Sequence, residues 1–388
     1  MVTLRPTHAW PAPRRSSVIV LVLVSLLFTA IAVTAFIEKA GNDLLVEVRQ
    51  ADARRLRQEA FSALEVTLAV LEDFRQADSG LHSTAEGWGT PLDWAGYSPS
   101  RGRTVDVSFQ DESGKIPLKK ADLTTMTNLF EFWQLAPADA AKLADAIEGW
   151  MQSGYVYSTA LNVDYPNATL PFAEPGRPLR TFSELKAIDV AKEAFFDENG
   201  RPNASYWRFV NDVSIFNFPQ PNVNGANPDV LAAVGQYTSD QQQKVGDYLS
   251  GTGQFAQEGQ QWFKDSTTLA SVAGLGGNAT QWATTISALR INITVHEGVS
   301  SYRLSAVVAP QGGATTNQTA AVNATAAAST ASTTATTSVT ATAAPATTAS
   351  TAATAAAASQ SINYPFTLLE LVEDDEIPQT PPPPAPSS

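Results

Sequence analysis

Residues 18–37 read VIVLVLVSLLFTAIAVTAFI and carry no charged side chain. About 20 consecutive apolar residues are what an α-helix needs to cross a bilayer. Arg14 and Arg15 stand before this run and Glu38 follows it. The positive-inside rule therefore predicts a single span with a cytoplasmic N-terminus and everything beyond the span exported. A cleaved signal peptide fits less well, because its apolar region spans about 7–15 residues and ends at a small-residue site.

The helical pattern continues beyond the apolar run. Apolar residues recur on one face of a helix, at Leu44, Leu45, Val48, Leu56, Phe61, Leu64, Leu68, Leu71 and Phe74. The pattern predicts one helix over residues 18–76, roughly 88 Å long at 1.5 Å per residue. Residues 18–37 would be its membrane half and residues 38–76 its amphipathic half. The alternative is a plain signal anchor followed by a separate juxtamembrane helix.

Composition sets limits on the function. The 388 residues carry a net charge of −13, which argues against nucleic acid as a partner. Cysteine is absent, so there are no disulfides, thiolate metal ligands or cysteine nucleophiles. The three histidines, His8, His82 and His296, are far apart, and we expect ordinary surface or strand histidines rather than a zinc site. No G-x-S-x-G elbow supports a serine hydrolase.

The exported part alternates strand and helix patterns. Strands are predicted over residues 104–109, 213–218, 289–295, 302–308 and 364–373. Helices are predicted over residues 123–133, 137–150, 239–249 and 260–273, with another from Asn227, where Pro228 suits the first helical position. Thr181 and Glu184 have the spacing of a capping box and predict one more short helix.

The chain changes character near its end. Residues 312–361 are almost entirely Ala, Thr and Ser, which lack the large apolar side chains that a core needs. We expect residues 310–362 to form a disordered loop between two neighbouring strands, since loop entropy rises only slowly with length. Residues 374–388, with their proline run, are expected to be a flexible tail.

Three segments resemble a known family. FQDESGKIPL at 109–118, RTFSEL at 180–185 and NVNGANPDVLAAV at 222–234 follow one another at plausible spacing behind the N-terminal helix. In this order they resemble minor pseudopilin K of the type II secretion system, the general secretion pathway protein K family. The resemblance covers residues 14–309 and 363–373.

The resemblance implies an α+β, pilin-like fold. The long helix would pack on an antiparallel sheet made from residues 77–120, 289–309 and 363–373. A large helical domain, residues 121–288, would be inserted into that sheet, and residues 1–17 would be a cytoplasmic leader. The implied role is non-catalytic: a subunit at the tip of a periplasmic pseudopilus, held by the inner membrane. Its implied partners are other minor pseudopilins, the major pseudopilin and the inner-membrane secretion platform.

This sequence departs from the family pattern in two places. Prepilin peptidase cuts after Gly, but Ser16 and Ser17 hold the expected processing position here. Family members also carry an acidic cluster resembling calcium ligands, where this chain has EGWMQSG at 148–154. Calcium takes six to eight oxygen ligands. Candidate ligands in this chain, loosely grouped, are Asp164, Glu174, Asp197 and Glu198.

Other function classes remain as alternatives. A membrane-anchored periplasmic binding or scaffold protein of the cell envelope has the same anchor and acidic exported part. A membrane-anchored enzyme could use paired carboxylates such as Asp111 and Glu112 as acid and base. Such turn acids are usually solvated, so we expect no catalytic residues.

Overall fold

The structure is a computed structural model of the whole chain. It describes residues 16–100, 102–161, 165, 172–274, 278–317 and 365–377. Most of the expected leader, most of the Ala/Thr/Ser loop and the end of the expected tail lie outside the described residues. The chain forms two compact units, residues 1–58 and residues 59–388. The first helix belongs to both units.

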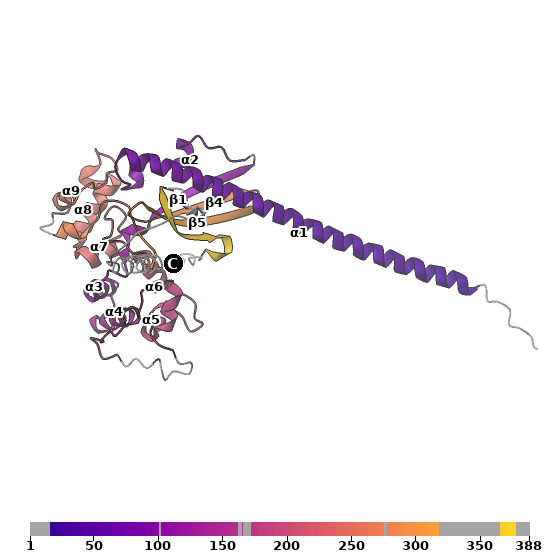
Figure 1. Ribbon diagram of the computed structural model, residues 1–388, viewed down its shortest axis with the longest axis horizontal. Coiled ribbons are helices and arrows are strands. Elements are labelled where there is room, and N and C mark those ends of the chain that lie inside the picture. The colour runs from indigo at the N-terminus through magenta and orange to yellow at the C-terminus, as the bar shows by residue number, and fades with distance from the viewer. Residues whose placement is uncertain are drawn as a thin grey trace, which may run out of the picture. The chain divides into compact units, whose positions relative to one another are not determined.

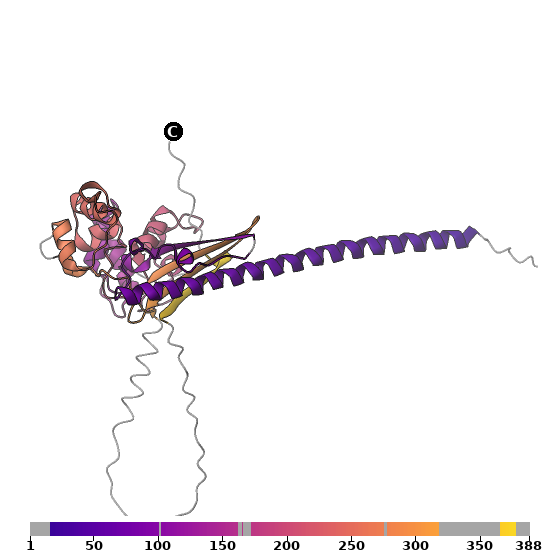
Figure 2. The same ribbon diagram turned by 90° about the horizontal axis from the view of Figure 1, so that it is seen from above.

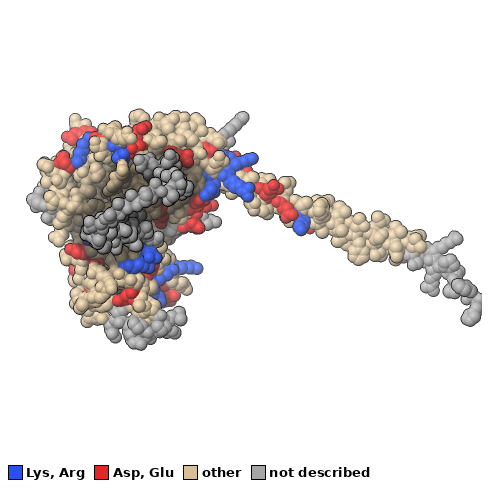
Figure 3. Space-filling view, in the orientation of Figure 1, with Lys and Arg blue, Asp and Glu red and all other residues tan. Residues whose placement is uncertain are grey.

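Helix α1 runs without interruption from Ser16 to Ala77. It meets the length and composition of a membrane-spanning helix, and the large apolar side chains of residues 18–37 are exposed. On the face shown in Figure 3, the first part of α1 carries neither basic nor acidic side chains. Within the second unit, by contrast, one face of α1 is buried. Its buried side chains are Ala60, Ala63, Leu64, Thr67, Leu68 and Leu71. This spacing puts one face of the helix into the core.

A four-stranded antiparallel sheet has the order β1-β4-β5-β6. Its strands are β1 Arg103–Asp111, β4 Leu289–Glu297, β5 Ser300–Pro310 and β6 Phe366–Glu373. Strands β4 and β5 form a hairpin, and β6 pairs with β5 across a bulge at Val307 and Val308. The two strands that flank the Ala/Thr/Ser segment are therefore neighbours, as predicted. The α+β class predicted from the sequence is confirmed.

Helices α3 to α9 all lie between β1 and β4 in the chain, although these two strands are paired with each other. Figures 1 and 2 both show these helices gathered beyond one end of the sheet. Their bounds are α3 Leu123–Phe132, α4 Pro137–Met151, α5 Asp189–Phe195, α6 Ala204–Asp212, α7 Pro228–Gly235, α8 Ser239–Ser250 and α9 Ser266–Ala273. Short pieces complete the fold: α2 Pro91–Trp94, β2 Ile116–Pro117 and β3 Val213–Ser214, the last two forming a parallel pair.

The helices share one apolar core. Its centre is aromatic: the ring of Phe209 lies 4.9 Å from that of Phe195 and 6.2 Å from that of Phe130, measured between centroids. All three side chains are fully buried. Ile116 of β2 and Val213 of β3 belong to the same core. The short parallel pair therefore joins the helical core to the end of β1.

Three local predictions are wrong. The strand expected over 213–218 is only two residues long, because Asn217 pairs with Thr315 instead. The capping box expected at Thr181 does not form, because Glu184 accepts from the backbone N–H of Arg180 instead. The short helix expected there is a 3-10 helix, Phe182–Ala187. The helix expected over 260–273 begins at Ser266, where Asp265 caps it.

The Ala/Thr/Ser segment also starts later than expected. Ala314 is buried, and its N–H donates to the carbonyl of Ser287. The side chain of Asn317 donates to the carbonyls of Leu179 and Ile215, at 2.9 and 3.1 Å. Residues 314–317 are thus packed against the head, and Pro310, where the loop was expected to start, is the last residue of β5.

Candidate functional site

Two of the segments singled out by the resemblance meet at the end of β1. Asn222 donates from its backbone N–H to the carbonyl of Ser113 at 2.7 Å, and from its side-chain amide to Asp111 Oδ2, also at 2.7 Å. The same amide reaches the carbonyl of His82 at 3.2 Å. One buried asparagine therefore joins the turn after β1, the segment before α7 and the loop after α1.

Glycines allow this close approach. A Cβ atom on Gly114 would lie 2.4 Å from the backbone carbon and oxygen of Gly225. A Cβ atom on Gly225 would lie 2.2 Å from Asp111 Oδ2. Contacts this short do not occur in proteins, so the two segments can pack only because neither position has a side chain.

Asp111 is the central acceptor of this junction. Its Oδ1 accepts from the N–H and the hydroxyl of Ser113, at 2.9 and 2.6 Å, while Oδ2 accepts from Asn222. Burial raises the pKa of Asp111 to about 6, although the hydrogen bonds from Ser113 and Asn222 act in the opposite direction. The desolvation cost of the charged carboxylate therefore exceeds the stabilisation that these hydrogen bonds give it.

This pKa predicts a pH-dependent stability. Because the folded-state pKa lies above the usual value of 3.8, the folded protein binds the proton of Asp111 more tightly than the unfolded chain does. The stabilisation is complete below about pH 4 and is lost as the pH rises through about 6. Between pH 4 and 7 the free energy of unfolding should fall by roughly 2 kcal/mol more in the unaltered protein than in Asp111→Asn. Urea unfolding across this range measures the difference, and parallel curves would contradict it.

A buried ion pair lies beside the junction. Glu112 is almost fully buried, and its Oε2 lies 2.9 Å from Lys115 Nζ and 3.4 Å from Arg290 Nε. Lys115 Nζ also donates to the carbonyl of Val210 at 3.0 Å, which fixes α6 to this turn. Glu112 was expected to be a solvated turn acid, and this is wrong, because the helices close over the turn.

A second buried carboxylate supports the start of α7. Asn227 caps the helix by accepting from the N–H of Val230, and its amide donates to Asp212 at 2.6 Å. Burial and the neighbouring Asp229 raise the pKa of Asp212 to about 7. Asp229 is held by Arg208 at 2.6 Å. The sequence-predicted cap and the proline after it are therefore confirmed, while the carboxylate that holds the cap comes from a different helix.

A cavity of about 320 Å³ opens at the junction. Its lining includes His82, Trp88, Asp111, Lys115, Asn224 and Asn227. Most of these polar side chains are already engaged with the protein. Asn224, for instance, joins the backbone of Phe263 and Thr284 through three hydrogen bonds of 2.7 to 3.0 Å. The arrangement is thus suited to fixing three segments in one geometry, and its carboxyl and amide groups serve as structural partners of one another.

The predicted site residues that the structure describes can be placed one by one. Ser16 and Ser17 begin α1, and Asp164 lies outside the described residues. Glu174 accepts from the hydroxyl of Tyr157. Asp197 is exposed and closes a turn by accepting from the N–H groups of Asn199 and Arg201, and Glu198 is exposed. Calcium binding stays a prediction.

The segment after α4 is held by a carboxylate. Asp145 is fully buried and accepts from Tyr155, Ser158 and Thr159, with the Thr159 hydroxyl at 2.6 Å. Burial acts to raise the pKa of Asp145, but these hydrogen bonds outweigh it and hold the pKa below its usual range. Here side-chain and backbone donors stabilise the charged carboxylate in place of water.

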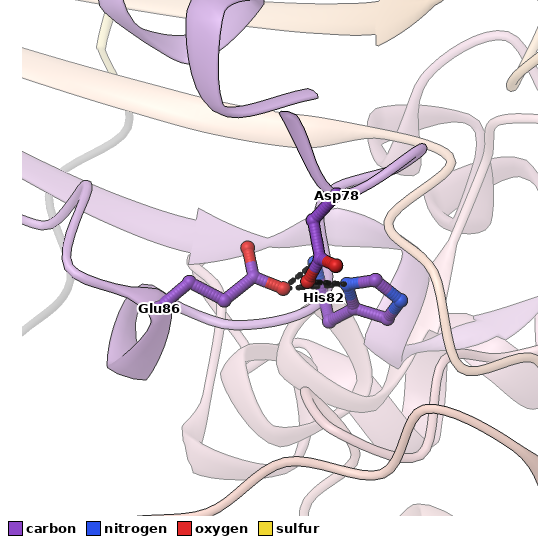
Figure 4. A group of neighbouring side chains, drawn as sticks. All are labelled: Asp78, His82 and Glu86. Carbon is purple, nitrogen blue, oxygen red and sulfur yellow. Dashed lines mark hydrogen bonds and ion pairs between the residues drawn. The ribbon is translucent and has the colours of Figure 1, made fainter. Parts of the chain in front are cut away.

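One group of side chains was missed by the sequence reasoning. His82 was expected to be an ordinary surface or strand histidine, but it is only 7% exposed. Figure 4 shows the carboxylates of Asp78 and Glu86 directed towards its ring, and the donor atoms of the three residues all lie within 4.8 Å of one another. The available signal was the spacing, because Asp78 and Glu86 each lie four residues from His82.

The fold is similar to that of a protein of known structure. A chain of the GspK-GspI-GspJ complex from the type 2 secretion system of enterotoxigenic Escherichia coli is similar to this protein, with 13% sequence identity and a TM-score of 0.48. The similarity covers 68% of this chain and 93% of that chain. No family model and no curated protein matches the sequence.

Proposed function

We propose that this protein is a minor pseudopilin resembling general secretion pathway protein K. It would be a non-catalytic subunit at the tip of the type II secretion pseudopilus and would support protein export across the outer membrane. Its partners would be other minor pseudopilins, the major pseudopilin and the inner-membrane secretion platform.

The contact between the turn after β1 and the segment before α7 carries this proposal. They are two of the three segments on which the sequence resemblance rests, and they lie 111 residues apart measured from Asp111 to Asn222. They lock together through Gly114 and Gly225. A chance resemblance at two distant places gives no reason for the two places to touch. A contact that the whole family uses to join the inserted helices to the sheet would give such a reason.

Helix α1 supports the proposed location. Its exposed apolar residues 18–37 have the length of a single span, and the first charged residue after them is Glu38. We place the N-terminus in the cytoplasm and the head in the periplasm, anchored in the inner membrane. Ser16 and Ser17 then stand on the cytoplasmic side, where the leader would be processed.

Complex formation tests the proposal. The full-length protein, purified in detergent and mixed with the other minor pseudopilins of the same cell, should elute from gel filtration as one complex of defined stoichiometry. An unrelated single-pass membrane protein in the same detergent serves as the control for non-specific association through membrane helices. Elution of the full-length protein separately from the other minor pseudopilins would contradict the proposal. It would favour the alternative of an anchored periplasmic binding or scaffold protein.

A further inference from the structure

We propose that Asp78, His82 and Glu86 form a binding site for a divalent transition-metal ion of the zinc class. The three donor atoms are His82 Nδ1, Glu86 Oε1 and Asp78 Oδ2. They come from the loop that follows α1 and from the 3-10 helix η1, Thr84–Glu86. This inference does not depend on the proposed function.

The separations of the donor atoms suit a small ion. His82 Nδ1 lies 2.5 Å from Glu86 Oε1 and 3.9 Å from Asp78 Oδ2. Tetrahedral zinc, with bonds near 2.0–2.1 Å, keeps neighbouring ligand atoms about 3.3 Å apart. Opening the shorter separation and closing the longer one to that value requires shifts of less than about 1 Å. The third separation, between the ligand oxygens of Asp78 and Glu86, is no more than 4.8 Å.

Two of the ligands are already held in place. The side chains of His82 and Glu86 are only 8% and 5% exposed. Glu86 accepts from the N–H of His82 at 3.0 Å, and its second oxygen accepts from Trp88 Nε1 at 2.8 Å. Such outer partners orient a metal ligand and raise its affinity. Asp78 is 44% exposed, so the site is open on its side to solvent, to an entering ion and to a water ligand.

The donor set distinguishes zinc from calcium. An imidazole nitrogen favours zinc, copper, iron or nickel, whereas calcium takes six to eight oxygens. This group offers one nitrogen and at most four carboxylate oxygens. The two carboxylates balance the charge of the ion, and a neutral imidazole would bind it through Nδ1 and carry its proton on Nε2.

Lys264 is the competitor of the metal. Its ammonium lies 3.3 Å from Asp78 Oδ2, and its side chain is 57% exposed. A metal ion and this ammonium repel each other at one carboxylate, so Lys264 must move away into solvent as the ion binds. Removal of the lysine charge should therefore tighten metal binding, whereas it would not do so if the ion were held elsewhere.

Zinc titration of the full-length protein in detergent tests the site. Calorimetry should show one equivalent of Zn²⁺ bound, with calcium at the same concentration giving no heat. Cobalt in place of zinc should give the visible absorption of a tetrahedral centre. Asp78→Asn and His82→Gln should each weaken zinc binding at least about tenfold. Lys264→Gln should strengthen it severalfold.

His296 provides the matched control. Its Nε2 also lies 3.9 Å from a carboxylate oxygen, that of Asp106, but both side chains are exposed. His296→Gln, and likewise His8→Gln, should leave the affinity unchanged. Absence of stoichiometric binding, or equal affinity in Asp78→Asn and the unaltered protein, would overturn the assignment. If His82→Gln fails to fold, Asp78→Asn decides, because Asp78 lies half-exposed at the surface.

Discussion

Gly114→Ala is expected to destabilise the head by about 3 kcal/mol or more, and to abolish assembly with partner subunits. The added methyl group would meet the backbone of Gly225 at 2.4 Å. A side chain could rotate away, but this backbone is held by the hydrogen bond from Asn222 to Ser113 and by the cap of α7. The two segments must therefore separate, which exposes the core beneath them. Urea unfolding in detergent gives the loss of free energy.

Gly246→Ala is the control for this substitution. Gly246 lies inside α8, and nothing comes within 4 Å of a Cβ atom placed there. The same change should stabilise the protein at this position, by about 0.5–1 kcal/mol, because alanine loses less backbone freedom in a helix. If Gly114→Ala proved as harmless as Gly246→Ala, the contact between the two segments would not be a packing lock, and the observation that carries the proposed function would be lost.

Glu112→Ala is expected to cost about 3–5 kcal/mol, because it leaves Lys115 charged and buried. Lys115 is 7% exposed, and with Glu112 gone its remaining partner is the carbonyl of Val210. The charge of Arg290 would still be paired, because its guanidinium lies 3.0 Å from the carboxylate of Glu370. The free energy of unfolding from urea titrations measures the loss.

The double variant tests the cause. Glu112→Ala combined with Lys115→Met keeps the truncation at position 112 but removes both charges, and it should recover much of the stability. Arg55→Gln breaks an exposed pair with Asp52 and should change the stability by no more than about 1 kcal/mol. A single variant as mild as Arg55→Gln would mean that water reaches Lys115. A double variant no better than the single one would point to lost packing instead of an orphaned charge.

Much of the fold could be predicted from local patterns. The apolar run and its amphipathic continuation predicted α1, and alternation predicted the four strands of the sheet. The cap at Asn227 was also correct, because an asparagine followed by proline satisfies a helix start within a few residues. Each of these features depends on neighbours in the chain, so the sequence contains its cause.

The errors came from competing partners, some distant in sequence and some nearby. The pattern of residues 213–218 is strand-like, but β3 ends at Ser214, and Asn217 forms a β-bridge with Thr315, nearly a hundred residues later. Thr181 and Glu184 have the right spacing for a capping box, yet Glu184 is drawn to Arg177 and to the N–H of Arg180. Glu112 looked like a solvated turn acid until the helices covered it.

The sequence alone determined that the protein is acidic and cysteine-free and that it has one membrane-length helix followed by strand and helix patterns. Composition fixes the first two properties, and hydrophobicity and periodicity, which are local, fix the others. The insertion of the helices into the sheet was implied only by the family resemblance. Only the tertiary structure decided which polar groups lie inside. It brought Asp111 to Asn222 and closed the helices over Glu112 and Lys115. It also buried His82 between two carboxylates. Burial depends on what packs from elsewhere in the chain, and burial raises the pKa of Asp111, makes Glu112 costly to remove and makes the group around His82 a candidate metal site.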